Sequence, residues 1–223
     1  MPSRLFLKTK LEIRSMGKVF FFPIFILWIV FPAAAWFSLQ TNFDVGMAYK
    51  QVASMVEGIV PLLSVVWPVS ALQMYFSDDT REILKVLHGP KVTALHTVVK
   101  YAVLHSLAVA VMYLILTLLF SQPEVLFYEC IRTLGQCLFM AGLSYAAACI
   151  FHSHLVGLLG AIVYVLVLFY MYNGQGNLFS IFLFDRLLWE EPQLIGRVVQ
   201  IWILGGGLLA VGYVENRFYL KEV

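Results

Sequence analysis

Charged residues are scarce in this sequence. Asp, Glu, Lys and Arg make up 13% of its 223 residues, whereas apolar residues make up 61%. A soluble domain is nearer half apolar and a quarter charged, and a chain of this size has too little interior to hide so much apolar surface from water. The composition therefore excludes an ordinary soluble domain. It predicts an all-α polytopic membrane protein with a single transmembrane domain over residues 1–223.

Cysteine is also rare. Cys130, Cys137 and Cys149 all fall within one apolar run, and their number is odd. This pattern argues against a disulfide framework and against a zinc site. Cys130 and Cys137 share one helical face, and we expect both to be packing residues. We predict no metal site.

Complete enzyme motifs are missing from the sequence. The pair Gly17-Lys18 lacks the upstream Gly and the hydroxyl residue of a phosphate-binding loop. Residues 142–146 lack the last Gly of a nucleophile elbow. We therefore predict that the chain is not an enzyme by itself, has no catalytic residue and binds no cofactor of its own.

Two other classes stay open as alternatives. Glu190, Glu191 and Arg197, with His152 and His154, loosely resemble motifs of CAAX-protease-like intramembrane enzymes, although five residues separate Glu191 from Arg197 where that family has three. The topology predicted below also places these acids and histidines on opposite sides of a bilayer core of about 30 Å, where they share no metal or water. The other alternative is a non-catalytic membrane scaffold or immunity protein.

Long apolar runs are abundant. A helix needs about 20 mainly apolar residues to cross the bilayer core. Six windows meet this requirement: 19–39, 57–76, 99–120, 126–150, 156–173 and 198–214. The first is too long for a signal-peptide core of about 7–15 residues, and we expect it to be retained as a span.

Lys and Arg indicate the orientation of the spans, because cytoplasmic loops are enriched in them. With the N-terminus in the cytoplasm, eleven of these residues lie on the cytoplasmic side, and three lie outside: Lys50, Arg186 and Arg197. We therefore expect a multi-pass protein of the plasma (inner) membrane of a bacterium, with both termini cytoplasmic. The same topology places Glu57, the first residue of the second window, on the outer side.

Two segments beside the spans have distinct patterns. Residues 1–17 predict an interfacial helix over 4–16, because apolar residues gather on one side of it and cations flank them. Its cations would lie near anionic headgroups of the inner leaflet. Residues 174–197 contain an apolar stretch too short to span, followed by charges and Pro192, and predict a re-entrant hairpin on the outer side.

The densest charge in the middle of the chain lies in residues 77–91. Ser77 or Asp79 can cap a helix over 78–88, acids occupy its first turn, and Gly89-Pro90 ends it. A helix this short is marginal in water and needs a surface to pack on. The residues alone leave two interpretations open: a connector on the membrane surface, or a lever seated in the groove of a partner.

The predicted spans contain a few charged side chains, and a charge placed in lipid costs free energy. Glu129 and Arg132 stand at i, i+3, and we favour an intrahelical ion pair near the headgroups over a functional pair. Lys100 is expected to extend to the inner interface. Small residues around Gly142 and at 205–207 predict close packing between helices.

The order of these parts resembles the permease subunits of ABC-type exporters of the six-span ABC-2 class. That class has an N-terminal elbow helix, a coupling helix between spans two and three, a second cytoplasmic turn between spans four and five, and an outer re-entrant hairpin before span six. The matching residues are 4–16, 78–88, 151–155 and 177–195. The local pattern of the coupling segment also matches, in Phe76, Asp78-Asp79, Thr80, Ile83-Leu84, Leu87, Pro90 and Lys91. It departs from the family at Arg81 and at His88-Gly89.

The resemblance implies a function and a set of partners. Two such subunits, identical or paralogous, would pair in membrane lipid above two ABC ATPase subunits that bind ATP and Mg²⁺. Closure of the ATPases would push on helix 78–88 and produce alternating access. The cargo would be amphipathic or hydrophobic, such as a drug, a peptide antibiotic or a lipid, and no nucleic acid would be bound.

The resemblance also implies four groups of site residues. The coupling helix would contact the ATPase through Asp78, Asp79, Thr80, Arg81, Glu82, Leu84, Leu87 and His88. A second cytoplasmic contact would use His152 and His154. The translocation path would be lined by Ser64, Trp67, Ser70, Gln73, Tyr164, Phe169 and Tyr170. An extracytoplasmic gate would use Phe182, Phe184 and Trp189.

Overall fold

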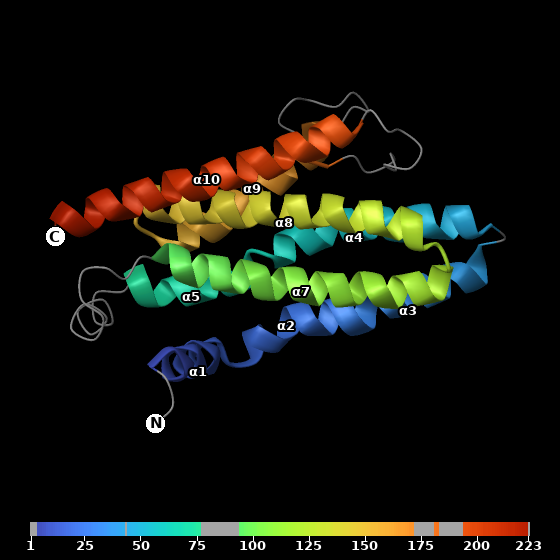
Figure 1. Cartoon of the computed structure of the whole chain (residues 1–223), viewed down its shortest axis with the longest axis horizontal. Coiled ribbons are helices and arrows are strands. Elements are labelled where there is room, and N and C mark those ends of the chain that lie inside the picture. Colours follow the sequence, from blue (N-terminus) through green and yellow to red (C-terminus); the bar gives the residue numbers. More distant parts are fainter. Residues whose placement is uncertain (1–3, 43, 77–93, 172–180, 183–193, 223) are drawn as a thin grey trace.

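The apolar runs form long helices that lie side by side (Figure 1). A computed structural model describes residues 4–42, 44–76, 94–171, 181–182 and 194–222. Its elements are α1 (Arg4–Met16), the 3₁₀ turn η1 (Gly17–Phe20), α2 (Phe21–Phe25), the π-helical turn η2 (Ile26–Val30), α3 (Phe31–Thr41), α4 (Val45–Leu63), α5 (Val66–Phe76), α7 (Ala94–Phe120), α8 (Pro123–Ile150), α9 (His154–Met171) and α10 (Ile195–Glu222). No strand occurs among the described residues, and the all-α prediction is confirmed.

Five helical stretches in this part of the chain are long and apolar enough to cross a membrane. They are Glu12–Thr41, Val45–Phe76, Ala94–Phe120, Pro123–Ile150 and Ile195–Phe218. Large apolar side chains stay exposed on their outer faces; Phe37 is 70% exposed and Leu118 77%. Such a surface is stable against lipid and unstable against water. The chain is therefore a multi-pass membrane protein. The apolar stretch of α9, His154–Leu168, is shorter than these five.

The second span begins earlier than the sequence predicted. α4 starts at Val45, where the Asp44 carboxylate accepts a hydrogen bond of 3.1 Å from the backbone N–H of Gly46 and caps the helix. Its first turns are amphipathic, with Lys50 on the exposed face. Because they are less apolar than the rest of the span, the predicted window begins only at residue 57. Glu57, the first residue of the predicted second window, therefore stands in the fourth turn of α4, where it is 1% exposed.

The connections alternate between the two ends of the bundle (Figure 1). One end holds α1, the last turn of α5, the first turn of α7, the turn between α8 and α9, and the end of α10. The opposite end holds the α3–α4 and α7–α8 connections and the start of α10. Two of the turns are tight and place a residue in the left-handed region, Ser121 with φ 56° and His152 with φ 52°.

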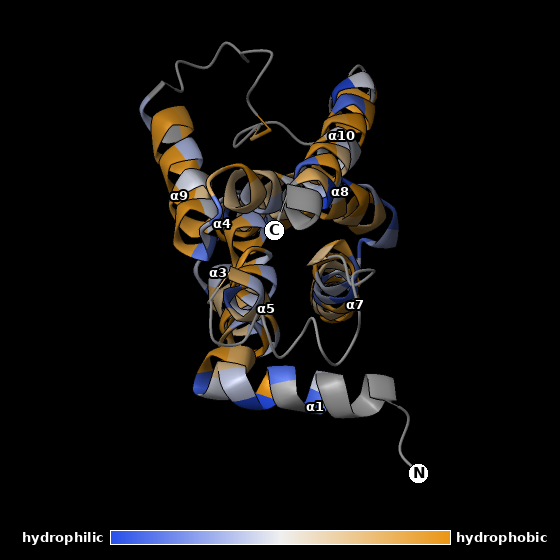
Figure 2. Cartoon of the chain, turned by 90° about the vertical axis from the view of Figure 1, so that its left-hand side faces the viewer, coloured by the Kyte–Doolittle hydropathy of each residue, from blue (hydrophilic) through white to orange (hydrophobic). Residues whose placement is uncertain are grey.

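Helix α1 crosses the bundle axis instead of following it (Figure 2). The chain changes direction at Gly17, whose φ of +54° lies in the left-handed region. That conformation costs other residues about 1–2 kcal/mol, so a glycine suits the position. The first span then runs through α2, η2 and α3. Pro32 in this span has no N–H to offer the carbonyl of Trp28, and the chain is π-helical there.

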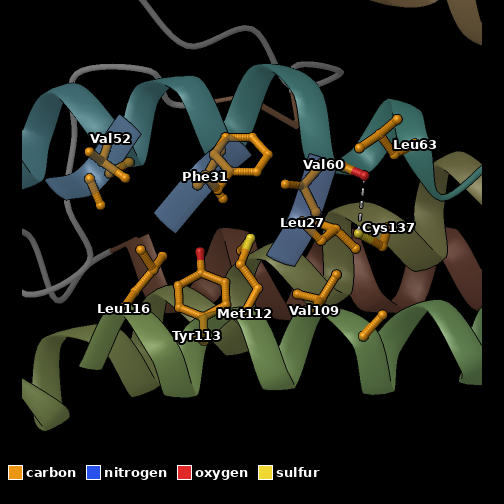
Figure 3. Packing of buried hydrophobic residues seen from close by; sticks show 14 of the residues in the cluster. Leu27, Phe31, Val52, Val60, Leu63, Val109, Met112, Tyr113, Leu116 and Cys137 are labelled. Atoms are coloured by element: carbon orange, nitrogen blue, oxygen red, sulfur yellow. Dashed lines mark hydrogen bonds between the residues drawn. The ribbon is translucent and has the colours of Figure 1, made fainter. Parts of the chain in front are cut away.

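The central core forms where the first span lies between α4 and α7 (Figure 3). Leu27 and Phe31 of the first span, Val60 of α4 and Met112 of α7 are almost completely buried in one cluster. From α8, the Cys137 thiol reaches the backbone carbonyl of Val60, with Sγ 3.8 Å from the oxygen. Cys137 is buried and makes no disulfide, which confirms its prediction as a packing residue.

Helices α8 and α10 approach closely through glycines. A Cβ on Gly205 would lie 2.8 Å from the backbone nitrogen of Phe139, and a Cβ on Gly142 would lie 2.7 Å from the carbonyl oxygen of Gly205. Nothing lies within 4 Å of the corresponding position on Gly206 or Gly207. The predicted close packing is therefore confirmed for Gly142 and Gly205, whereas the two glycines that follow Gly205 do not contribute to it.

This difference predicts opposite effects of the same substitution at neighbouring positions. Gly205→Ala forces two backbones apart and should lower the free energy of unfolding by about 1–3 kcal/mol. Gly206→Ala meets open space and should be neutral or stabilising by up to about 1 kcal/mol, since alanine is the better helix former. Melting temperatures of the two purified variants in one detergent test this. Equal losses would contradict the close contact at Gly205.

Candidate functional site

A stripe of polar residues runs along one face of α8. Glu129, Arg132, Thr133 and Gln136 follow the spacing i, i+3, i+4, i+7, which places them on the same side of a helix. All four side chains are buried. The stripe faces α4 and α7, because its hydrogen bonds and ion pairs reach Glu57 and Tyr113. We refer to Glu57, Glu129, Arg132 and Gln136 as the polar cluster.

Arg132 joins the two carboxylates of this cluster. Its Nη2 lies 2.5 Å from Glu129 Oε2 and 3.8 Å from Glu57 Oε2. Gln136 Nε2 donates to Glu57 Oε1 at 2.7 Å. The intrahelical pair predicted from the sequence is confirmed. The pair is buried inside the protein, with Glu129 1% exposed and Arg132 2%, and it reaches across to Glu57 of α4.

Such a cluster is costly to bury. Each ion loses several kcal/mol of hydration in a low-dielectric interior, and only good geometry and further hydrogen bonds offset that loss. Charges at this depth in a membrane protein therefore indicate function by default. Here they also fix α4 against α8, since displacing either helix would leave a buried charge without its partner. Next to the cluster, the Tyr113 hydroxyl and Thr133 Oγ1 share a hydrogen bond of 2.7 Å.

A short non-helical stretch, Ile181–Phe182, extends down to the polar cluster. Gln136 Nε2 also donates to the Ile181 carbonyl at 2.7 Å, and the Tyr164 hydroxyl of α9 makes a hydrogen bond to the Ile181 backbone. Both side chains of the stretch are buried, in a cluster that includes Phe139. Gln136 is thirteen residues from the start of α8, or about 20 Å along the helix axis. Ile181 and Phe182, the described residues between α9 and α10 in this stretch, thus lie inside the bundle against α8 and α9.

At the opposite end of the bundle, α1 is held by another buried carboxylate. Glu12 is 1% exposed. It pairs with Lys100 Nζ and accepts a hydrogen bond of 3.0 Å from the Tyr101 hydroxyl, both on α7. Ser15 Oγ lies 3.8 Å from Met74 Sδ on α5. Lys100, which was predicted to extend to the inner interface, thus binds a carboxylate of the protein.

The path residues predicted on the second span occupy different environments. Ser64 is buried, with Oγ 2.6 Å from the Pro61 carbonyl and 3.0 Å from the Cys137 carbonyl. Trp67 is buried and donates from Nε1 to the Phe20 carbonyl at 2.8 Å. Ser70 is half-buried and Gln73 is exposed. In the single chain, neither Ser64 nor Trp67 reaches an open surface.

The other predicted site residues that the structure describes lie on α9, in the turn before it and at Phe182. Tyr164 is half-buried, with its ring 5.3 Å from that of Phe139, whereas Tyr170 is 85% exposed. Phe182 is buried beside the polar cluster. His152 lies exposed in the turn before α9, and His154 begins that helix. The side chain of Phe169 lies outside the described part, as do Phe184, Trp189 and all the coupling-helix residues: Asp78, Asp79, Thr80, Arg81, Glu82, Leu84, Leu87 and His88.

The sequence offered a signal for part of the polar cluster. The i, i+3, i+4, i+7 spacing would have identified Thr133 and Gln136 beside Glu129 and Arg132. Glu57 is not part of this pattern, because it lies on another helix, α4. The described residues contain no group of three or more His, Cys, Asp and Glu side chains able to hold a metal ion.

Comparison of this chain with models of protein families, with curated proteins and with solved structures finds no match. The geometry of the two polar sites and the arrangement of the helices are therefore the features of the molecule that bear on its function.

The polar cluster predicts a large effect of removing its cation. Arg132→Met leaves Glu57 and Glu129 together without the guanidinium and should lower the free energy of unfolding by about 3–5 kcal/mol. The matched control is Arg217→Met, which removes an exposed arginine from α10 and should change stability by less than about 0.5 kcal/mol. Thermal unfolding in detergent measures both. Adding Glu129→Gln to Arg132→Met should recover part of the loss, and equal stability of the two arginine variants would rule out a paired cluster.

Proposed function

We propose that the chain is the transmembrane permease subunit of an ABC exporter of the six-span ABC-2 class. It would move an amphipathic or hydrophobic cargo, driven by ATP hydrolysis on two separate ATPase subunits, and would pair with a second permease subunit. The observation that carries this proposal is the position of α1. This helix lies across one end of the bundle and contacts both helices that flank residues 77–93 (Figure 2).

That position matches what an elbow and a coupling segment require. Residues 77–93 connect α5 to α7, and Tyr75 and Thr97, close to the two ends of this connection, share a hydrogen bond of 2.6 Å. A force applied to helix 78–88 would therefore act on α5, α7 and α1 together. This mechanical link between one cytoplasmic segment and several spans is what alternating access needs.

The proposal takes α9 as the sixth span. Its 18 residues extend about 27 Å, close to the thickness of the bilayer core. The end of the bundle with α1 and the C-terminus carries Lys10, Arg14, Lys100 and Arg217, which by the positive-inside rule would face the cytoplasm of a bacterial cell. In this arrangement α1 lies along the inner leaflet of the plasma membrane, and both termini are cytoplasmic.

The contacts of Ile181 and Phe182 support a re-entrant hairpin on the outer side. Non-helical backbone at membrane depth is stable only where protein or water satisfies it. Gln136 binds the Ile181 carbonyl, and Tyr164 binds the backbone of the same residue. We propose that Phe182 belongs to an extracytoplasmic gate together with Phe184 and Trp189. Tyr164 would then meet the cargo when Phe182 withdraws.

Co-purification with an ATPase tests the proposal. An epitope-tagged chain expressed with the genes around its own should retain an ATP-hydrolysing partner in mild detergent. Leu84→Asp or Glu82→Arg should abolish this association while the chain remains folded, because a buried charge or a reversed charge would disrupt the helix-in-groove contact. Glu124→Arg, an exposed acid at the other end of the bundle, is the matched control and should retain the partner. If the Glu82 and Glu124 variants behave alike, the coupling role fails.

The turn at His152 allows a test that separates function from folding. Its φ of 52° is strained for a residue with a Cβ, so His152→Gly should leave stability unchanged or raise it by about 1 kcal/mol. If His152 belongs to the second ATPase contact, the same variant should weaken stimulation of the ATPase by the permease. A melting temperature and an ATPase assay on the reconstituted complex give the two readouts. Unchanged stimulation would remove His152 from the contact.

A further inference from the structure

Helix α1 separates its charges onto opposite sides. The segment over residues 4–18 contains a single acid, Glu12, and five cations: Arg4, Lys8, Lys10, Arg14 and Lys18. Glu12 is buried against α7, where Lys100 and Tyr101 bind its carboxylate. Lys10, Arg14 and Lys18 are all exposed. The acid is thereby withdrawn from the surface, and the exposed side chains described on this segment carry only positive charge.

The cationic surface adjoins an apolar one. Directly after Lys18 the chain enters the first span, and Phe21, Phe22 and Phe25 of α2 are each more than half exposed. Exposed phenylalanines in a membrane span face acyl chains. A row of cations beside exposed aromatic side chains has the two-part chemistry of a phospholipid: a charged headgroup at one end and hydrocarbon at the other.

We propose that α1, η1 and α2 together form a binding site for an anionic phospholipid. Lys10, Arg14 and Lys18 bind the phosphate and the anionic headgroup, and Phe21, Phe22 and Phe25 pack against the acyl chains. Charge complementarity selects this occupant, because a zwitterionic lipid lacks the net negative charge that three exposed cations attract. An acidic protein or a nucleic acid would leave the neighbouring phenylalanines without an apolar partner.

The site has a structural consequence inside the bundle. The side of α1 opposite the cations contacts α5 through Ser15 and α7 through Glu12. A lipid bound to the cationic side of α1 would therefore stabilise the contacts of α1 with α5 and α7, the two helices that flank residues 77–93. The proposal requires only a membrane-embedded bundle, so it stands independently of the proposed transport function.

Lipid binding to the purified full-length chain tests the proposal. The chain is held in a zwitterionic detergent and titrated with fluorescent short-chain phosphatidylglycerol or phosphatidylcholine. We expect the wild-type chain to prefer phosphatidylglycerol and to lose this preference at high salt. Because each basic residue near an anionic surface contributes about 1 kcal/mol, Arg14→Gln/Lys18→Gln should bind phosphatidylglycerol roughly thirtyfold more weakly. Binding of phosphatidylcholine should not change.

A second variant controls for overall charge. Lys50→Gln/Arg197→Gln removes the same number of cations from the opposite end of the bundle and should retain wild-type affinity for phosphatidylglycerol. Equal binding of the two lipids by the wild-type chain would overturn the proposal. Equal losses in the two double variants would also overturn it, since they would show a response to net charge and no site on α1.

Discussion

The structure depends on the absence of water around its spans. In lipid a charged or polar side chain must find its partner within the protein, because no solvent replaces a lost hydrogen bond. Glu57, Arg132 and Gln136 meet this constraint together, and in doing so they join α4 to α8 at one defined register. The apolar contacts of the bundle permit several arrangements of neighbouring helices. The polar cluster selects one of them.

The same constraint explains how Ile181 and Phe182, which are not helical, can lie inside the bundle. Ile181 is not helical, so its backbone polar groups need partners, and Gln136 and Tyr164 supply them. The Gln136 amide therefore donates both to Glu57 of α4 and to the Ile181 carbonyl. On the proposed function, this sharing links an outer gate to the α4–α8 interface through one amide group.

The sequence predicted the helices well where apolar runs are uninterrupted and poorly where they are not. The window 99–120 lies within α7 and 126–150 within α8, because both runs stay mainly apolar over more than 20 residues. The start of α4 was not predicted, because Lys50 lowers the apolar content of its first turns. The meeting of Glu57 with Arg132, like the burial of Glu12 against α7, is a tertiary contact between residues far apart in the chain. No local pattern encodes either contact. Local spacing did predict the Glu129–Arg132 pair, and Gln136 lies on the same face of α8 at i+7 from Glu129.

The glycine contacts of α8 limit how the molecule can move. Gly142 and Gly205 hold α10 against α8 at backbone distance, and Gly157 brings α9 equally close to Ser144 of α8. At such distances one helix cannot rotate about its own axis without driving a side chain into its neighbour. These contacts therefore hold α8, α9 and α10 together as a unit. A rearrangement that separated this unit from α4 would have to break the buried ion pair of Arg132 with Glu57.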